Sequence, residues 1–438
     1  MRLSELLADS PFQGYSYAYP HKTAYRPLAP AVRLDELWAG ERHDALFLYL
    51  HVPFCEMRCA FCNLFTQPRP QDDVVNAYLT TLRRHAHQVR AALPDARFAR
   101  CAIGGGTPTY LDVAGLADML DIAEGIMGAD LRAIPVSVEV SPATVEQAKL
   151  ELLRRRGVDR ISIGVQSFNE AETAQAGRPQ PRATVARALD MIRSAGFPTL
   201  NIDLIYGLPG QSVASWVESL ETALQYAPEE LYLYPLYVRP LTGLGKSARH
   251  WDDIRPACYH EGVALLHSRG YVQTSMRMFQ VRHAATIAGP VYCCQEDGMV
   301  GIGCGARSYT RGLHYANEYA VGARGVRSII AAYVARTDAA FAHAEFGFRL
   351  DGTEQRRRYV IQSLLTREGL RFAPYRHLFG TQPVDDLPEL NELAAHGLAR
   401  READGLCLTE AGLFWSDVIG PWLYSDAVRG LMAAYPLQ

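Results

Sequence analysis

The chain has 438 residues, of which 48% are hydrophobic and 21% charged, and its formal net charge at pH 7 is −3. This is the composition of a globular protein, and the nearly balanced charge gives no reason to expect a nucleic-acid or membrane partner. The N-terminus lacks a basic start followed by an apolar stretch, and no uncharged apolar run could span a bilayer, so we expect a cytoplasmic protein. A chain of this length predicts a large domain plus a smaller one.

Residues 1–44 are rich in Tyr and Pro, which predicts an extended N-terminal arm that packs on the rest of the protein. Apolar stretches and amphipathic stretches then alternate. The apolar stretches predict buried strands at 45–52, 100–103, 136–140, 160–165, 200–205 and 231–236. The amphipathic stretches predict helices at 74–92, 111–127, 145–156, 183–195 and 213–226. This alternation indicates an α/β domain with parallel strands, arranged as an open sheet or a barrel.

The pattern changes near residue 340. Helical spacing at 354–365 and 386–397 is followed by two short strand patterns at 398–400 and 405–408, an order similar to a winged helix. We therefore predict a C-terminal winged-helix-like α+β cap at 341–438. DNA binding is one interpretation of such a domain, but acidic residues between 385 and 402 are at least as frequent as basic ones. That balance favours a structural or lid role.

Three of the nine cysteines lie within eight positions, directly after the first predicted strand: Cys55, Cys59 and Cys62. An odd number of cysteines in a long chain argues against a secreted disulfide framework. Soft thiolates held this close together are the ligands of an iron–sulfur cluster. Three ligands leave one iron of a [4Fe–4S] cluster open. The alternative, a zinc site, would need a fourth ligand, for which His51 is the local candidate.

The segment 49–55 and the loop that carries the three cysteines resemble the signature of the radical S-adenosylmethionine (SAM) superfamily. The resemblance implies that the open iron binds SAM and that the reduced cluster cleaves SAM to methionine and a 5′-deoxyadenosyl radical. It implies a small-molecule substrate and a reductant such as a flavodoxin or a ferredoxin. We expect Phe61 to lie near the adenine of SAM.

Later strand ends resemble the HemN-like branch of that superfamily, which includes oxygen-independent coproporphyrinogen III oxidases and class C radical SAM methyltransferases. The resemblance implies a partial (β/α)6 TIM-like barrel over residues 45–340, with the site at the carboxyl ends of its strands. The SAM-binding residues that it implies are Phe61, Gly104, Gly105, Gly106, Thr107, Glu139, Gln166, Arg178 and Asp203. It also implies that Gln295 helps to hold a second SAM, and the candidate catalytic residues are Tyr49 and Gln295.

The chain departs from the coproporphyrinogen oxidases at one position. Those enzymes carry a fourth cysteine two residues after the third, where this chain has Leu64. The HemN-like heme chaperones and the class C methyltransferases both lack that cysteine, and the methyltransferases keep the two-SAM site. We therefore predict two SAM molecules and transfer of a methyl or methylene group to an sp2 carbon. Two alternatives stay open: decarboxylation of a propionate, and a non-catalytic heme chaperone, although chaperones of this branch usually lack the long N-terminal arm.

Other side chains have two interpretations each. Cys293 and Cys294, just before Gln295, and Cys304 either take part in chemistry as thiols or metal ligands, or pack as small apolar groups. Arg239 and Arg277 lie among Tyr and Met residues and would suit a carboxylate-bearing substrate.

Overall fold

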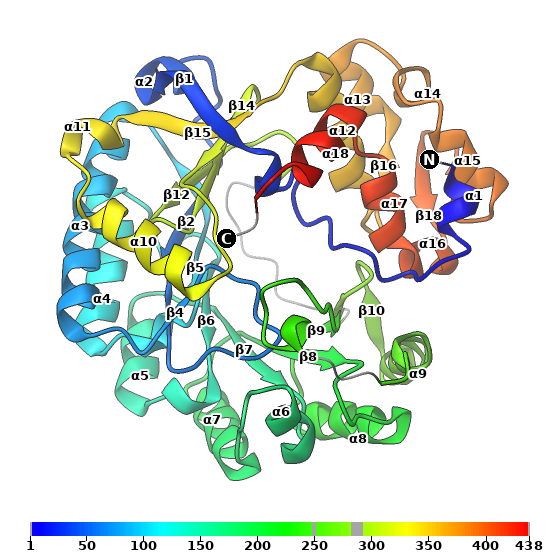
Figure 1. The fold of residues 1–438 in the computed structure, drawn as a ribbon, viewed down its shortest axis with the longest axis horizontal. Helices are drawn as coiled ribbons and strands as arrows, with labels where there is room; N and C mark the ends of the chain where they lie inside the picture. The colour runs from blue at the N-terminus through cyan, green and yellow to red at the C-terminus, as the bar shows by residue number, and fades with distance from the viewer. Residues whose placement is uncertain (1, 248–250, 282–291, 437–438) are drawn as a thin grey trace.

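The computed structural model describes residues 2–247, 251–281 and 292–436. Its central element is a sheet of 13 strands in the order β1-β15-β14-β13-β12-β2-β5-β6-β7-β8-β9-β11-β10. The strands from β12 to β9 in this order are parallel, and antiparallel strands extend the sheet at both ends. The edge strands β1 and β10 do not pair with each other. The sheet therefore forms an open, partial barrel (Figure 1).

The parallel strands confirm the predicted α/β barrel. They are β2 (Leu46–Val52), β5 (Phe98–Gly105), β6 (Val136–Val140), β7 (Arg160–Gln166), β8 (Thr199–Tyr206), β9 (Glu230–Pro235) and, beside β2, β12 (Met299–Ile302). The first six lie within two residues of the predicted bounds, because their apolar stretches are bounded by polar residues, Gly or Pro.

Helices cover the outer face of the parallel strands, as Figure 1 shows. They are α3 (Asp72–Ala92), α4 (Val113–Asp121) with a π-helical turn (Ile122–Ile126), α5 (Gln147–Arg155), α7 (Arg182–Ser194) and α8 (Val213–Leu224). Side-chain caps fix two of the starts, since Asp112 accepts a hydrogen bond from Gly115 N and Ser212 from Ser215 N. The short helix α6 (Glu170–Gln175) was not predicted, because six residues are too few to show a helical apolar period.

The antiparallel strands come from both ends of the chain. They are β1 (Arg26–Arg33), β10 (Tyr271–Gln273), β11 (Met278–Val281), β13 (Arg307–Tyr309), β14 (Leu313–Ala316) and β15 (His343–Arg349). Strand β1 lies in the predicted arm and β15 in the predicted cap, so the sheet extends past residues 45–340 on both sides. Helices α2 (Leu34–Trp38), α9 (Arg255–Ser268), α10 (Ala323–Val334) and α11 (Asp338–Phe341) connect these strands.

The inner faces of the parallel strands surround the lumen of the barrel, and in β2, β6 and β9 their side chains are less buried than those of the outer faces. In β2, Phe47 and Tyr49 keep exposed area while the leucines between them are buried. The same alternation leaves Glu139 exposed in β6 and Tyr232 and Tyr234 half-buried in β9. Alternate residues of a strand point to opposite faces, and the outer faces are buried under helices. The inner faces of these strands therefore keep exposed side-chain area toward the lumen, unlike the packed interior of a closed (β/α)8 barrel.

The C-terminal region is the predicted winged-helix-like α+β domain. It contains α12 (Gly352–Leu364), α13 (Phe372–Phe379), α14 (Pro383–Asp386), α15 (Leu390–Ala395) and a small sheet in the order β16 (Leu370–Arg371), β18 (Gly405–Leu408), β17 (Ala399–Glu402). Helices α16 (Glu410–Phe414), α17 (Ser416–Trp422) and α18 (Asp426–Ala433) follow. The prediction of one helix at 386–397 is wrong: Pro388 restricts Leu387 to non-helical backbone angles, which separates α14 from α15.

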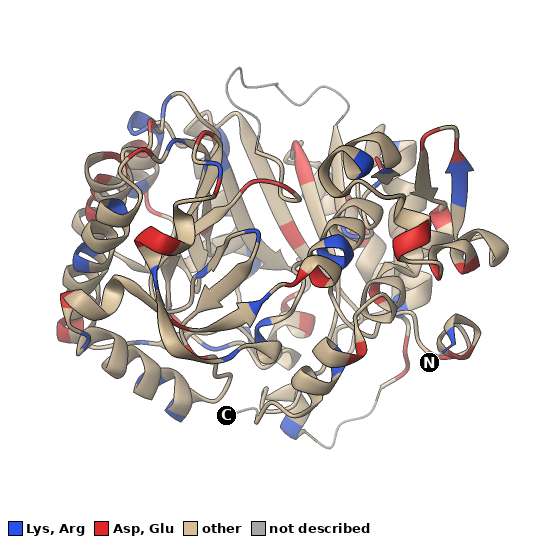
Figure 2. Cartoon of the chain, turned by 90° about the horizontal axis from the view of Figure 1, so that it is seen from above, with Lys and Arg blue, Asp and Glu red and all other residues tan. Residues whose placement is uncertain are grey.

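The N-terminal arm joins the two regions. Helix α1 (Leu3–Leu6) lies beside α17 in Figure 1, and Leu3, Leu6 and Tyr19 share a buried core with side chains of the C-terminal domain. Tyr19 also donates a hydrogen bond to Glu354 of α12. Basic and acidic residues are both spread over the helices (Figure 2). Among the described residues, no helix is both long and apolar enough to cross a membrane.

Candidate active site

The three cysteines lie on one loop that is closed at its base. Cys55 ends β3 (Phe54–Cys55), which pairs in parallel with β4 (Gln67–Pro68). Arg69 N donates to the carbonyl of Cys55 over 2.9 Å, and Cys62 N donates to that of Cys59 over 3.1 Å. All three thiols are free. The short spacing in sequence therefore becomes a compact loop at the carboxyl end of β2.

Backbone from two other segments fixes the middle of this loop. Ala60 N donates to the carbonyl of Ala176 over 3.0 Å, and Ala60 O accepts from Leu244 N over 2.7 Å. A Cβ atom on Gly177, which has a φ of +66°, would lie 2.7 Å from the Ala60 side chain, and one on Gly243 would lie 2.9 Å away. Glycine is required at these two contacts because any larger residue would push the cysteine loop away.

Arg178 contacts the cysteine loop directly. Its Nη1 donates to Cys59 Sγ over 3.2 Å, and its Nη2 donates to Ser141 Oγ over 3.0 Å and to the carbonyl of Gly164 over 2.9 Å. The side chain is buried, so these bonds hold the guanidinium in one position. An arginine donor stabilises negative charge on a sulfur ligand. Arg178 was predicted to contact SAM, and the structure places it against a cluster cysteine.

The three thiols fit a [4Fe–4S] cluster better than a zinc ion. His51, the zinc candidate, is 3.2 Å through Nδ1 from Tyr49 Oη and 3.4 Å through Nε2 from the Phe65 carbonyl. Burial raises the pKa of Cys55 to about 12, so that thiol stays protonated at neutral pH until iron displaces the proton. A cluster spaces its cysteines over separate irons and leaves one iron free.

Glu139 lies against the glycine-rich end of β5. Its Oε2 accepts a hydrogen bond from Gly105 N over 2.9 Å, and a Cβ atom on Gly104 would come within 2.8 Å of its carboxyl carbon. The carboxylate has exposed area but lies inside the concave lumen, and this restricted hydration raises its pKa. The bond to Gly105 and the charge of Arg160 oppose that shift.

Asp203 and Gln166 occupy the next two strands. Asn201 Nδ2 donates to the Asp203 carboxylate over 2.8 Å and Ser162 Oγ over 3.2 Å, yet burial raises the Asp203 pKa to about 6. Gln166 has a φ of +69°, and its amide folds back to 2.7 Å from where a Gly164 Cβ would lie. Gly164 is the register partner of Asp203. Strands β6, β7 and β8 thus bring the predicted residues to one end of the barrel.

Gln295 lies elsewhere. Its Oε1 accepts from the thiols of Cys293 and Cys294 over 3.2 and 3.3 Å, and its carbonyl accepts from Arg358 over 2.9 Å. It lines a cavity of about 90 Å³ together with Phe379 of the C-terminal domain. Within the part of the chain that the structure describes, no hydrogen bond joins Gln295 to the strand-end residues. Its role with a second SAM stays a prediction.

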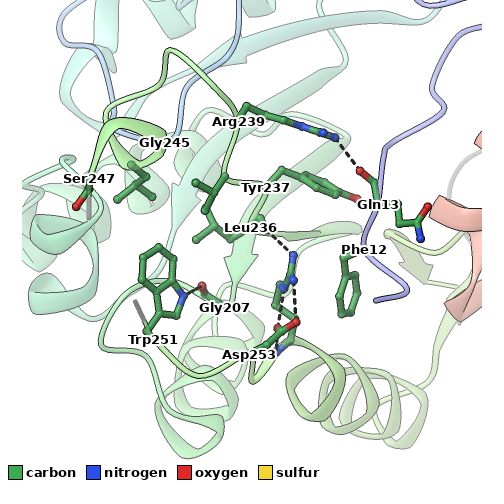
Figure 3. A pocket seen from close by; sticks show the side chains of 13 residues that line it. Phe12, Gln13, Gly207, Leu236, Tyr237, Arg239, Gly245, Ser247, Trp251 and Asp253 are labelled. Atoms are coloured by element: carbon green, nitrogen blue, oxygen red, sulfur yellow. Dashed lines mark hydrogen bonds and ion pairs between the residues drawn. The ribbon is translucent and has the colours of Figure 1, made fainter. Parts of the chain in front are cut away.

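A larger cavity, of about 540 Å³, is lined by residues that follow β8 and β9 and by the N-terminal arm (Figure 3). Its wall includes Leu236, Leu244 and Trp251, which belong to the apolar group that packs around Phe61. On the far wall, Arg239 Nη2 donates to the carbonyl of Gln13 over 3.2 Å, as Figure 3 shows. The cavity therefore has an apolar side toward the cysteine loop and a side formed by the N-terminal arm.

The structure changes the role expected for Arg277. This buried arginine bonds both carboxylate oxygens of buried Asp417 over 2.6 Å, also donates to Tyr237 Oη, and lies 3.9 Å from the centre of the Tyr15 ring. It is already paired and is not free for a substrate carboxylate. Two other cations, Lys22 and Arg307, were not among the predicted site residues, because neither belongs to a motif or a periodic pattern.

Comparisons with known proteins agree with this architecture. Residues 49–223 match the radical SAM superfamily and residues 350–415 the HemN C-terminal domain. The oxygen-independent coproporphyrinogen III oxidase of Synechocystis sp. is 28% identical over 443 residues, covering 91% of this chain and 90% of that protein. The heme chaperone HemW of Escherichia coli is 31% identical over 276 residues, covering 60% of this chain and 69% of that protein.

Other matches are partial in sequence or concern the fold alone. The oxygen-independent coproporphyrinogen III oxidase of Paracoccus denitrificans is 38% identical, and the chain spans 48% of that relative's length. The solved structure of the Escherichia coli coproporphyrinogen III oxidase (HemN) has a TM-score of 0.77 at 22% identity, covering 96% of this chain and 98% of that chain. The fold is therefore the same.

The chain belongs to the HemN-like branch of the radical SAM superfamily. A [4Fe–4S] cluster and SAM are the cofactors that this membership implies, and the comparisons support a radical SAM enzyme. The relatives described above are named as oxidases and as a heme chaperone, so the prediction of methyl transfer gains no support from them.

Proposed function

We propose that this protein catalyses the oxidative decarboxylation of a carboxylate-bearing small molecule of the porphyrinogen type. The extent of similarity carries the proposal. The alignment with the Synechocystis oxidase covers 91% of the chain, whereas that with the Escherichia coli heme chaperone covers 60%. In this structure the N-terminal arm brings aromatic side chains to the mouth of the barrel, since Tyr15 lies over Arg277 and Tyr17 over Arg307.

The residues at the strand ends fit the proposed cofactors. When bound, the cluster and SAM supply a 5′-deoxyadenosyl radical. The three cysteines would hold the cluster, with Arg178 donating to one sulfur. Glu139 and Asp203 offer carboxylates to the ammonium or hydroxyl groups of SAM, and the glycines of β5 leave room for SAM to approach the backbone. We expect a flavodoxin or a ferredoxin as the reductant.

The lumen suits a reaction that must be shielded from water. Its walls carry Tyr49, Tyr232 and Tyr234, whose pKa values burial raises, so these phenols stay protonated and can donate hydrogen bonds. In the proposed reaction a propionate loses a hydrogen atom from the carbon β to its carboxylate, then CO2 and one electron, and becomes a vinyl group. The hydrogen atom ends in 5′-deoxyadenosine, and the electron passes to a one-electron acceptor such as an oxidised iron–sulfur protein.

A heme chaperone is the second candidate. Leu64, 53% exposed, stands where the resembling oxidases have a fourth cysteine, and the Escherichia coli chaperone is 31% identical over 69% of its own length. Transfer of a methyl group with a second SAM is a third possible outcome of the same experiment.

The test is anaerobic turnover of the reconstituted protein with coproporphyrinogen III and methyl-deuterated SAM. We expect CO2, 5′-deoxyadenosine and an unlabelled vinyl product. Deuterium in the product would show methyl transfer, and tight heme binding without 5′-deoxyadenosine would show a chaperone. Cys59→Ala should abolish the cluster's visible absorbance and SAM cleavage, whereas the matched control Cys407→Ala, in the C-terminal sheet, should retain both.

A further inference from the structure

We propose that Lys22 and Arg307 form a carboxylate-binding subsite in the barrel lumen, which holds one carboxylate of the substrate near the cysteine loop. The subsite depends on the proposed function for the identity of the substrate, but its geometry depends only on contacts within this chain. Neither residue is among those that would hold the cluster or SAM.

Both residues reach the lumen. Arg307 begins β13 and shares a face with Tyr309, because residues two apart on a strand point the same way. Tyr309 packs with Phe47 and Tyr49, the lumen-facing side chains of β2. Lys22 comes from the short 3-10 helix η1 (Lys22–Ala24) of the N-terminal arm, and the ring of the preceding residue, His21, lies 6.2 Å from the rings of both Tyr17 and Tyr319. Burial lowers the pKa of Lys22, and the charge of Arg307 lowers it further.

Aromatic rings hold the two cations. The Nζ atom of Lys22 lies 3.6 Å from the centre of the Tyr319 ring, and the guanidinium carbon of Arg307 lies 4.6 Å from the centre of the Tyr17 ring. Such contacts orient a cation without neutralising it. Tyr319 Oη donates to the carbonyl of Asn63 over 2.8 Å, one residue after the third cysteine. The subsite is therefore tied to the cysteine loop.

No anion of the described chain neutralises this pair. Within residues 2–247, 251–281 and 292–436, neither Lys22 nor Arg307 forms an ion pair with a carboxylate, and the remaining positions carry no Asp or Glu side chain. Arg307 Nη1 is buried without a hydrogen-bond partner. Burying a charged donor without a partner is unfavourable. Both side chains keep some exposed area, so an anion in the lumen can reach them and remove this cost.

The neighbours of the pair connect it to the SAM side. Tyr49 packs against Tyr309, which shares a face of β13 with Arg307; burial raises the pKa of Tyr49, the charge of Glu139 raises it further and that of Arg307 lowers it. A planar guanidinium matches the two oxygens of a carboxylate, and an adjacent ammonium adds a second charge-assisted bond. A carboxylate could come from the substrate or from the amino-acid part of a second SAM, and we assign it to the substrate.

The test measures binding without turnover. The cluster-reconstituted full-length protein is titrated with coproporphyrin III and with its tetramethyl ester, in which the carboxylates are neutral, by following Soret absorbance. We expect Arg307→Gln and Lys22→Met each to weaken binding of the free acid by about tenfold or more and to leave ester binding unchanged. Arg307→Lys, which keeps the charge, should lose less. Arg84→Gln, on the outer helix α3 and paired with Asp338, is the control.

The outcomes separate the two proposals. Equal acid-to-ester ratios in the wild type, Arg307→Gln and Lys22→Met would overturn the subsite, even if decarboxylation were observed. A changed ratio without any decarboxylation would overturn the proposed function alone. Equilibrium dialysis with labelled SAM forms the second arm: if Arg307→Gln lowers the number of bound SAM molecules and leaves porphyrin binding intact, the carboxylate belongs to SAM and our assignment is wrong. Circular dichroism checks folding, and Lys22→Met repeats the test should Arg307→Gln not fold.

Discussion

Two arginines of this protein, the buried Arg277 and the half-buried Arg307, differ in what surrounds them. Arg277 has a carboxylate partner: it donates to both oxygens of Asp417 and to the hydroxyl of Tyr237 and lies over the face of Tyr15, although its Nε has no hydrogen-bond partner. Arg307 has aromatic faces but no carboxylate among the described residues, and its Nη1 has no hydrogen-bond partner. The two belong to the same open barrel, so the difference does not come from the fold class.

The difference shows which charges serve the structure and which are available to a ligand. Arg277 joins the region after β10 to α17 of the C-terminal domain, and a closed ion pair suits that structural role. Lys22 and Arg307 face the lumen and have no carboxylate partner among the described residues, and Arg307 Nη1 has no hydrogen-bond partner. Glu139 and Asp203 each accept hydrogen bonds, yet burial raises the pKa values of both carboxyl groups.

The largest expected effect breaks the complete pair. Asp417→Asn leaves the Arg277 guanidinium buried without its anion, which should lower the free energy of unfolding by about 3–5 kcal/mol. Urea denaturation measures this loss. Asp426→Asn is the matched control, since its pair with Arg429 is at the surface. If both variants were equally stable, the view of Arg277 as a structural link would be refuted.

The next effect concerns Arg178, which contacts a cysteine of the cysteine loop. Arg178→Met removes the donor to Cys59 Sγ, and a hydrogen bond to a charged group contributes about 1.5–3 kcal/mol. We expect chelator-driven loss of the cluster to be at least about tenfold faster than in the wild type. The decay of visible absorbance under anaerobic conditions reports it, with exposed Arg182→Met as the control. Identical decay in the two variants would argue against a role for Arg178 at the cluster.

A third effect depends on pH. The Asp203 pKa of about 6 lies above the ordinary value, so its contribution to the stability of the ligand-free fold is present at low pH and is lost as pH rises through 6. Under the proposed function SAM binds to the ionised carboxylate of Asp203, so the pH dependence of SAM binding has the opposite sign. SAM affinity should fall by up to about tenfold per pH unit below pH 6. Calorimetry from pH 5 to 8 measures it, and a slope that persists in Asp203→Asn would assign the effect to another group.

The smallest expected effect on stability comes from changing Arg307, which has no carboxylate partner among the described residues. Arg307→Met removes a half-buried guanidinium that has no carboxylate partner among the described residues, so the free energy of unfolding should stay within about 0.5 kcal/mol of the wild type or rise. Thermal and urea denaturation of the ligand-free protein provide the values. A loss as large as that of Asp417→Asn would show that Arg307 has a structural partner, and the contrast between the two arginines would disappear.

Much of the barrel could be predicted from the sequence because its signals are local. The strand at 136–140 has its predicted bounds, and the spacing of Cys55, Cys59 and Cys62 identified the cluster loop. Contacts between residues that are far apart in the sequence leave no such local signal. Arg277 and Asp417 are 140 residues apart, and Arg178 and Cys59 are 119 apart, so no periodicity connects them. The contact of Arg178 with a cysteine needed the folded chain.

The lumen cations could not be found for a related reason. Lys22 lies in an arm without repeating pattern, and Arg307 follows a glycine-rich segment, so neither residue type nor spacing marked them. The same limit applies to Gln295, which sequence resemblance assigned to a second SAM and which the structure places beside Cys293, Cys294 and Arg358. Sequence identified the class of chemistry, and the fold was needed to show which charges face the lumen.

The central claim is that a radical formed at the cysteine loop takes a hydrogen atom from a propionate held in the lumen. Its most direct test is anaerobic turnover with coproporphyrinogen III deuterated at the propionate carbons β to the carboxylates, followed by mass spectrometry of 5′-deoxyadenosine. We predict one deuterium atom in each 5′-deoxyadenosine formed during decarboxylation. Unlabelled 5′-deoxyadenosine, with the deuterium retained in the porphyrinogen, would contradict the claim.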